Sequence, residues 1–308
     1  MTDVMSRAAG RYRPLMVLSV AAAVLAVVTA VGVVVDGRVL TGVPIWLKPF
    51  KFSVSFVLYA ATLAWMLAQL PRRSRVAEWS AGVVVAMALV EMVVIVGQVL
   101  RGTTSHYNET TPLNAALWQV MGMAIMVLFV AHVIVAVVLL VRRARDRATT
   151  WAVGLGLGLS ALGMLVAFPM VRQDRAGAEG IAGAHSVGVP DGGPGLPILG
   201  WSTTGGDLRI GHFVGLHAMQ ALPILAFLLR RYLDRWLDER SRVGLLVVAG
   251  AGYGVLTVLL TWQALRGQPL LRPDLTTLTA LAALVAATTV AVVAVVARRR
   301  RPELALAA

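Results

Sequence analysis

The sequence predicts an all-α, polytopic membrane helix bundle with eight transmembrane helices and both termini in the cytoplasm. Composition is the first reason, because 58% of the 308 residues are hydrophobic, 14% are charged and the mean hydropathy is +0.78. Typical soluble domains carry about 25% charged residues, so this chain is poor in the groups that an aqueous surface needs. The second reason is the number of long apolar segments, and the third is the placement of arginines between them.

A helix needs about 20 residues to cross a hydrocarbon core of about 30 Å. Segments of this length recur along the chain, and we interpret residues 1–308 as a single integral membrane domain. The first segment is too long for the apolar region of a signal peptide and lacks a convincing A-x-A cleavage site, so we expect it to be retained. The predicted spans are 14–35, 50–70, 76–98, 114–141, 150–171, 211–229, 243–263 and 276–297.

Arginine clusters lie near the N-terminus, in every second loop between the spans, and after the final span. By the positive-inside rule these loops are cytoplasmic, which places both termini there as well. The basic residues behind the net charge of +13 are confined to short loops, so we expect them to orient the protein in the bilayer. No nucleic-acid partner is predicted. The Ala, Val and Arg bias suggests the plasma (inner) membrane of a bacterium. The clusters are Arg7, Arg11 and Arg13; Arg72, Arg73 and Arg75; Arg142, Arg143, Arg145 and Arg147; Arg230, Arg231, Arg235, Arg240 and Arg242; and Arg298 to Arg301.

One connection, 172–210, is much longer than the others and is predicted to lie on the extracytoplasmic side. It is rich in Gly, Pro and Ser, so it is expected either to cover the bundle or to remain mobile. Within the fifth span, Gly154 and Gly158 are predicted to mark close packing between helices.

The chain has no cysteine, which excludes disulfides, thiolate metal sites, iron–sulfur clusters and cysteine nucleophiles. Redox chemistry would therefore need a bound cofactor. The G-x-S-x-G elbow, the H-E-x-x-H zinc motif and the phosphate-binding P-loop are also missing. The common hydrolases of membranes lose support, although the sequence does not decide whether the protein is an enzyme.

Polar residues of the spans form a first tier near the middle of the bilayer. Counting about 1.5 Å per residue from the arginine-marked ends places His132 at roughly 15 Å, His217 at roughly 19 Å and Glu91 at roughly 22 Å. Gln220 follows His217 by three residues and shares its helix face. A charged group that faces lipid costs a few kcal/mol, so these side chains are expected to face the bundle interior.

A second tier of polar residues lies near the predicted outer boundary, and we interpret it as a substrate vestibule. Lys48 and Lys51 are its most unusual members, because they are the only lysines among 28 basic residues. A long lysine stem can reach water from within a span, or its ammonium can meet a carboxylate or an anionic substrate. The tier consists of Lys48, Lys51, Gln98, Arg101, His106, Asp207, Arg209, His212, Gln263 and Arg266.

The first functional hypothesis is a haem-binding electron-transfer or oxidoreductase component, served by a redox or membrane partner protein. It rests on one midplane histidine in each of two spans, His132 and His217, which could ligate one haem iron from opposite sides. The alternative for each histidine is an ordinary hydrogen bond to a neighbouring helix.

The second hypothesis is a proton-coupled transporter or permease for a small solute such as an anion. Glu91, His217 and His132 would then carry protons, because ionisable groups inside a membrane commonly form proton relays. Gln220 would complete this candidate catalytic site beside His217. The alternative for Glu91 is a structural ion pair with Lys51, Arg101 or His217. A third hypothesis is a non-catalytic scaffold or sensor whose outer loops contact partner proteins.

Overall fold

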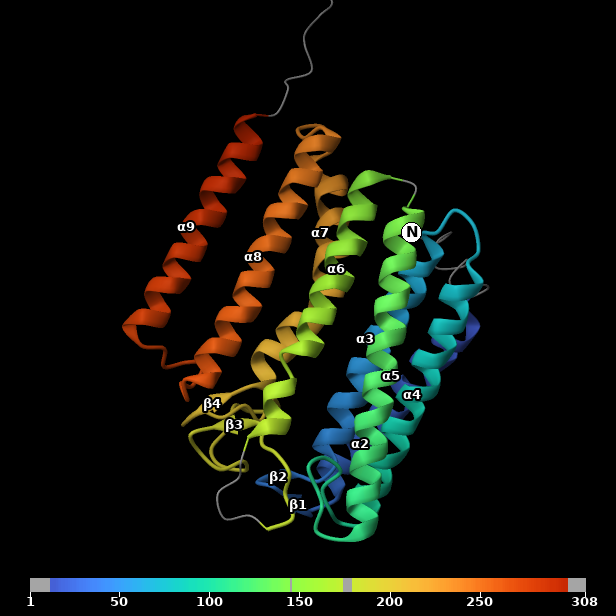
Figure 1. The fold of residues 1–308 in the computed structure, drawn as a ribbon, viewed down its shortest axis with the longest axis vertical. Coiled ribbons are helices and arrows are strands. Elements are labelled where there is room, and N and C mark those ends of the chain that lie inside the picture. Colours follow the sequence, from blue (N-terminus) through green and yellow to red (C-terminus); the bar gives the residue numbers. More distant parts are fainter. Residues whose placement is uncertain (1–11, 145, 174–178, 299–308) are drawn as a thin grey trace, which may run out of the picture.

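The structure is a computed structural model that describes residues 12–144, 146–173 and 179–298, and Figure 1 shows its helical bundle. Eight of its helices are long and apolar enough to cross a membrane, as predicted. Arg7, Arg11, Arg145 and Arg299 to Arg301 lie outside the described residues. The helices are α2 (Arg13–Val35), α3 (Leu47–Ala68), α4 (Arg75–Leu100), α5 (Pro112–Arg142), α6 (Arg147–Leu165), α7 (Arg209–Leu233), α8 (Glu239–Leu265) and α9 (Leu275–Ala297).

Most helices extend beyond the apolar segments because their capping residues lie outside those segments. The side chains of Ser74, Asp146 and Asp238 each accept a hydrogen bond from a backbone N–H at the start of a helix, which satisfies a donor that the helix itself cannot. The fifth span differs in its second half, where α6 gives way to a 3₁₀ helix at Phe168–Arg172. Pro169 explains the change, since proline has no N–H and disfavours an α conformation in the residue before it.

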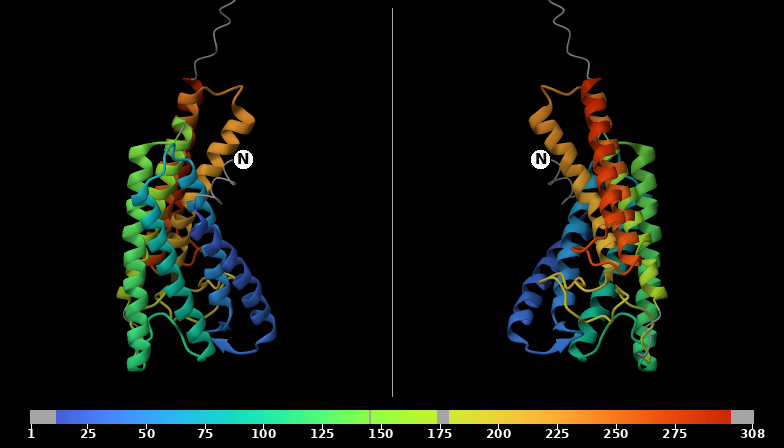
Figure 2. Two further views of the ribbon diagram at one scale, coloured as in Figure 1. Left: turned by 90° about the vertical axis from the view of Figure 1, so that its right-hand side faces the viewer. Right: turned by 90° about the vertical axis from the view of Figure 1, so that its left-hand side faces the viewer.

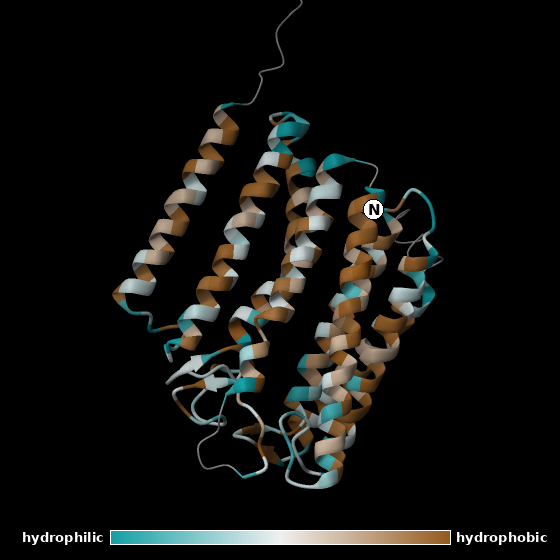
Figure 3. Cartoon of the chain, in the orientation of Figure 1, coloured by the Kyte–Doolittle hydropathy of each residue, from teal (hydrophilic) through white to brown (hydrophobic). Residues whose placement is uncertain are grey.

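The helices pack as two neighbouring groups, α2 to α5 and α6 to α9 (Figure 1). Contacts of α5 with α6 and of α3 with α7 join them. Apolar residues cover the middle of the bundle and polar residues collect at its two ends (Figure 3). Only Thr277 is buried on α9, so this helix has the smallest buried share among the eight described helices.

The start of α2 and the end of α9 lie at the same end of the bundle, as Figures 1 and 2 show. This end also carries the loops with the described arginine clusters. Its assignment to the cytoplasm remains a prediction from those arginines.

Loops and short strands cover the opposite end of the bundle, and the described part of 172–210 supplies most of this covering segment (Figure 1). Strand β3 (Ser186–Val187) pairs with β4 (Gly206–Asp207), and a smaller hairpin of β1 (Val39–Leu40) and β2 (Val43–Pro44) follows α2. Of the two expectations for this connection, residues 179–208 fulfil the first: they cover the bundle. We call residues 179–208 the outer cover.

Close packing of α6 on α7 depends on glycines, but not on the pair that the sequence suggested. Gly158 faces open space, and Gly154 lies against the Leu140 side chain of α5. A Cβ on Gly163 would instead overlap the backbone of α7 at Gly215. The prediction for Gly158 was therefore wrong, because spacing along one helix does not say which face meets a neighbour.

Candidate functional site

Glu91 of α4 is the most unusual polar residue in the interior of the bundle. Its exposed fraction is 1%, and neither carboxyl oxygen has a hydrogen-bond partner among the residues that the structure describes. The alternative, an ion pair with Lys51, Arg101 or His217, does not form in the structure, where those side chains bind other groups. Buried polar atoms are nearly always hydrogen-bonded, so Glu91 contributes little to stability in this arrangement.

Gln98, two turns further along α4, is equally buried but fully partnered. Its amide nitrogen donates to the Asn114 side-chain oxygen at 3.1 Å and to the Thr104 carbonyl at 3.2 Å. Its amide oxygen accepts from Arg101, which also donates to Asn114. These two members of the predicted vestibule thus connect α4, α5 and the loop between them, which is a structural role.

Lys48, in the first turn of α3, is the positive charge that acts on Glu91. The same ammonium also acts on His106 and His185 at the outer end. It is half-buried and makes no hydrogen bond or ion pair with any described residue. Lys48 therefore lies between the interior carboxyl and the outer end of the bundle, with its donors uncommitted.

Rings from four parts of the chain meet near Lys48, and we call them the outer aromatic cluster: Phe52, His106, Tyr107, Trp118 and His185. Ring centroids are 5.6 Å apart for Phe52 and His106, and 5.1 Å apart for Tyr107 and His185. Trp118 contacts both His106 and Tyr107, at 5.7 and 4.9 Å. The cluster joins α3, α5, the loop 101–111 and the outer cover.

Asp191 holds His185 in place within the outer cover. The ring Nδ1 lies 2.9 Å from a carboxylate oxygen of Asp191, and the backbone N–H groups of His185 and Ser186 donate to the same carboxylate. This arrangement fixes the ring, and its Nε2 atom has no hydrogen-bond partner in the described part of the chain.

The protonation states follow from burial and from these bonds. Burial lowers the pKa of His185 to about 4, although the hydrogen bond to Asp191 works in the opposite direction. Burial also lowers the pKa of His106 well below its ordinary value, and the charge of Lys48 adds to this shift. Burial raises the pKa of Asp191, but the hydrogen bonds from His185 outweigh it and hold this pKa below its usual range. At neutral pH a neutral imidazole therefore donates to an ionised carboxylate.

Lys51 of α3 and Arg209 of α7 bind backbone carbonyls of the outer cover. The Lys51 ammonium donates to the Leu199 carbonyl at 2.9 Å. Arg209 donates to the Gly200 carbonyl at 2.6 Å and forms an ion pair with the fully buried Asp207. These three predicted vestibule residues hold the outer cover on the bundle, and their hydrogen-bonding capacity is largely used there.

His132 bridges three helices near the middle of the bundle and has an exposed fraction of 0%. Its Nδ1 lies 2.9 Å from the Tyr59 hydroxyl of α3, and its Nε2 lies 3.1 Å from the Leu157 carbonyl of α6. Since both ring nitrogens are engaged, ligation of haem iron would require His132 to give up one of these bonds. Haem binding through His132 stays a prediction, and the observed contacts favour an interhelical hydrogen bond.

His217 and Gln220 lie on α7 and contact each other at 3.3 Å. Gln220 also donates to the Thr62 hydroxyl of α3 at 3.2 Å. Both side chains are half-buried, so the expectation that they lie in the interior holds only in part. They belong to the polar contact between α3 and α7.

Two further members of the predicted vestibule lie in other surroundings. His212 contacts the Gly163 carbonyl of α6 at 2.7 Å, at the close crossing of α6 and α7. Arg266 is exposed and forms an ion pair with Asp274 between α8 and α9. The vestibule is thus not a single site: Lys48 and His106 meet at the outer aromatic cluster, and Arg266 serves the α8–α9 connection.

No known protein family, curated protein or solved structure matches this chain. The function must be inferred from the residues themselves. Within residues 12–144, 146–173 and 179–298, no group of three or more His, Cys, Asp or Glu side chains is arranged to hold a metal ion.

Sequence reasoning named Tyr107 beside His106 in the loop 101–111, but it missed Trp118 and His185 as their neighbours and Asp191 as the partner of His185. Depth counting cannot place a residue in an irregular loop, and His185 and Asp191 both lie in one. One signal was available: they are a histidine and an aspartate six residues apart in a segment otherwise made mostly of Gly, Pro and small residues.

Proposed function

We propose that the protein is a proton-coupled membrane transporter for a small anion. Glu91 is the proton-carrying group, and Lys48 is the group that contacts the anion. The observation that carries the proposal is the interior carboxyl of Glu91, whose oxygens have no hydrogen-bond partner in the described residues. An unpaired polar group in an apolar interior is destabilising. A role in function therefore explains the presence of Glu91 better than a role in stability does.

The long-range electrostatic interaction between Glu91 and Lys48, which form no ion pair, provides a physical route to coupling. With Glu91 ionised, its charge is balanced by that of Lys48 across the interior. When Glu91 takes up a proton, the ammonium of Lys48 is left without its counter-charge and attracts an anion more strongly. Each event thus favours the other, as linkage between two sites requires, and the loaded and empty states have the same net charge.

The outer aromatic cluster is consistent with the same proposal, in which the anion enters from the side of the outer cover. His106 and His185 are neutral at neutral pH, as their lowered pKa values indicate, so they add no charge beside Lys48. The Nδ1–H of His185 is already donated to Asp191, which leaves its Nε2 atom as an acceptor. His217 remains a predicted proton carrier on the α7 side of the bundle, with Gln220 as its hydrogen-bonding neighbour.

Reconstituted liposomes that contain a trapped pH dye test the proposal. An inward gradient of a small anion, such as acetate, lactate, phosphate or chloride, is imposed at equal pH on both sides. We expect one of these anions to acidify the lumen in the presence of the protein. Glu91→Gln should abolish proton entry because the amide cannot exchange a proton. Lys48→Gln should weaken the dependence on anion concentration.

The matched control is Glu109→Gln, which makes the same chemical change at an exposed position of the loop 101–111 and should leave the signal unchanged. Proton entry that survives Glu91→Gln at the rate of the unsubstituted protein would refute the role of Glu91. Absence of acidification with every anion tested would refute the transport proposal itself.

A further inference from the structure

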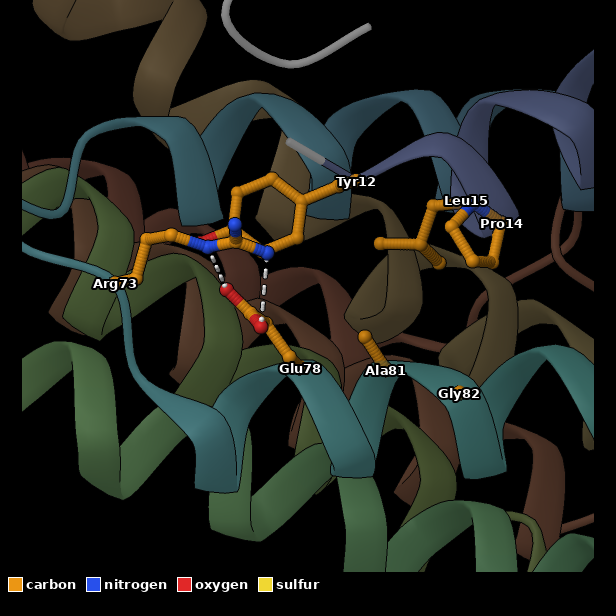
Figure 4. Close-up of a pocket in the computed structure, with 7 residues that line it drawn as sticks. All are labelled: Tyr12, Pro14, Leu15, Arg73, Glu78, Ala81 and Gly82. Carbon is orange, nitrogen blue, oxygen red and sulfur yellow. Dashed lines mark hydrogen bonds and ion pairs between the residues drawn. The ribbon is translucent and has the colours of Figure 1, made fainter. Parts of the chain in front are cut away.

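A groove between α2 and α4 opens at the arginine-rich end of the bundle, remote from the outer aromatic cluster. Figure 4 shows the part nearest the bundle end, where Pro14 and Leu15 lie opposite Ala81 and Gly82, and Tyr12 lies beside the Arg73–Glu78 ion pair. This part encloses about 200 Å³. A second hollow of about 360 Å³ shares Pro14 with the first and continues between the same two helices.

The groove exists because α2 packs mainly on α3 and only lightly on α4. Small residues on α4 widen the space that remains. Gly82 is exposed, and a Cβ at this position would meet no atom within 4 Å. The opening is therefore not filled by any described side chain.

The chemistry of the lining changes from one end of the groove to the other. Arg13 and Arg73 stand at the bundle end, whereas Val17, Leu18 and Val85 line the deeper part. From Pro14 to Ala21 the groove follows about 10 Å of helix. It thus offers cations at headgroup level and an apolar channel of the kind that an acyl chain fills.

Positive charge dominates the headgroup end. Arg73 is partly neutralised, since it donates to Glu78 at 2.7 and 3.1 Å. Arg13 is exposed and makes no ion pair with any residue that the structure describes. Arg72 and Arg75 flank Arg73 closely in the sequence, and Arg142 donates to the Arg73 carbonyl at 3.3 Å. Among the described residues, arginines therefore outnumber Glu78 at this corner.

We propose that the groove binds one anionic phospholipid, with the phosphate at Arg13 and Arg73 and an acyl chain between Leu18 and Val85. Basic pockets between transmembrane helices are suited to anionic headgroups, and the apolar hollow supplies the second half of the recognition. The inference is independent of the proposed transport function, because it concerns a different side of the bundle.

Native mass spectrometry of the purified full-length protein tests this site. Phosphatidylglycerol and phosphatidylcholine with identical acyl chains are added in separate titrations. We expect one phosphatidylglycerol to bind at least about fivefold more tightly than phosphatidylcholine, the factor that one arginine near an anionic lipid surface is worth.

Gly82→Leu fills the groove and should abolish the tight phosphatidylglycerol site. The fold should tolerate it, because a leucine fits the open space and is a better helix former than glycine. The matched control is Gly97→Leu on the same helix, where a Cβ also meets nothing within 4 Å. Arg13→Gln should remove the preference for phosphatidylglycerol, whereas Arg230→Gln, at an exposed arginine of α7, should not.

Two results would overturn the proposal. One is equal affinity for the two lipids in the unsubstituted protein. The other is tight phosphatidylglycerol binding that persists in Gly82→Leu at the level of Gly97→Leu. Thermal unfolding of both glycine variants verifies that they are folded before the comparison is made.

Discussion

Glu91 and Gln98 provide a direct test of what the interior carboxyl contributes to stability. Both lie on α4, both have an exposed fraction of 1%, and they differ in whether their polar atoms are partnered. Replacing each by methionine keeps a similar side-chain length and removes the polar atoms. We expect the two substitutions to change the free energy of unfolding in opposite directions.

The magnitudes follow from the partners. Glu91→Met removes a buried group without hydrogen bonds, which should stabilise the protein by about 1 to 3 kcal/mol. Glu91→Met also removes the negative charge that attracts Lys48, which would destabilise the protein. Lys48 is half-buried, so solvent screening keeps this loss small. Gln98→Met leaves the Thr104 carbonyl without its side-chain donor, removes one of the two donors to Asn114 and takes an acceptor from Arg101. The loss should destabilise the protein by about 1 to 3 kcal/mol.

Denaturation in a mild detergent, followed by tryptophan fluorescence, measures both changes against the unsubstituted protein. The same Glu91→Met protein should be inactive in the liposome assay, so that stability rises while transport is lost. A clear loss of stability in Glu91→Met would refute the reasoning, because it would mean that the carboxyl has a partner in the folded protein.

Three further predictions concern other parts of the bundle. Stability should fall as the pH is lowered from about 6.5 towards 4: the folded pKa of His185 is lowered to about 4, so its contribution is present above its ordinary pKa and is lost on acidification, by at most roughly 3 kcal/mol. Gly163→Ala should destabilise the protein by several kcal/mol, because the new Cβ overlaps the backbone of α7. The purified protein should show no Soret band after haem is added, since both ring nitrogens of His132 are hydrogen-bonded.

Each of these predictions has its own control. The pH dependence of unfolding should become shallower in His185→Gln, and an unchanged slope would contradict the assignment. Gly158→Ala places a methyl group in open space on the same helix and should be neutral or slightly stabilising, so equal losses in the two glycine variants would count against the close crossing. A Soret band that disappears in His132→Ala would restore the haem hypothesis.

The eight spans could be predicted because hydrophobic length is a local property of the chain. Each span must satisfy the same requirement of about 20 apolar residues, whichever helices it later packs against. The alternation of the arginine loops is local in the same sense. Burial of Glu91 and His132 also follows from the high cost of polar groups in lipid, and both are buried in the structure.

The partners of those buried residues could not be predicted, because they depend on contacts between segments far apart in the sequence. Depth counting placed Glu91, His132 and His217 in one layer, but it did not say that His132 is fully engaged while Glu91 is unpaired. The same holds more strongly for the outer cover. Its irregular backbone has no repeating pattern from which side-chain orientation could be predicted, so only the folded structure shows that His185 and Asp191 lie beside the rings near Lys48. The sequence by itself thus determined which residues enter the membrane, and only tertiary packing decided which of them keep a free polar atom.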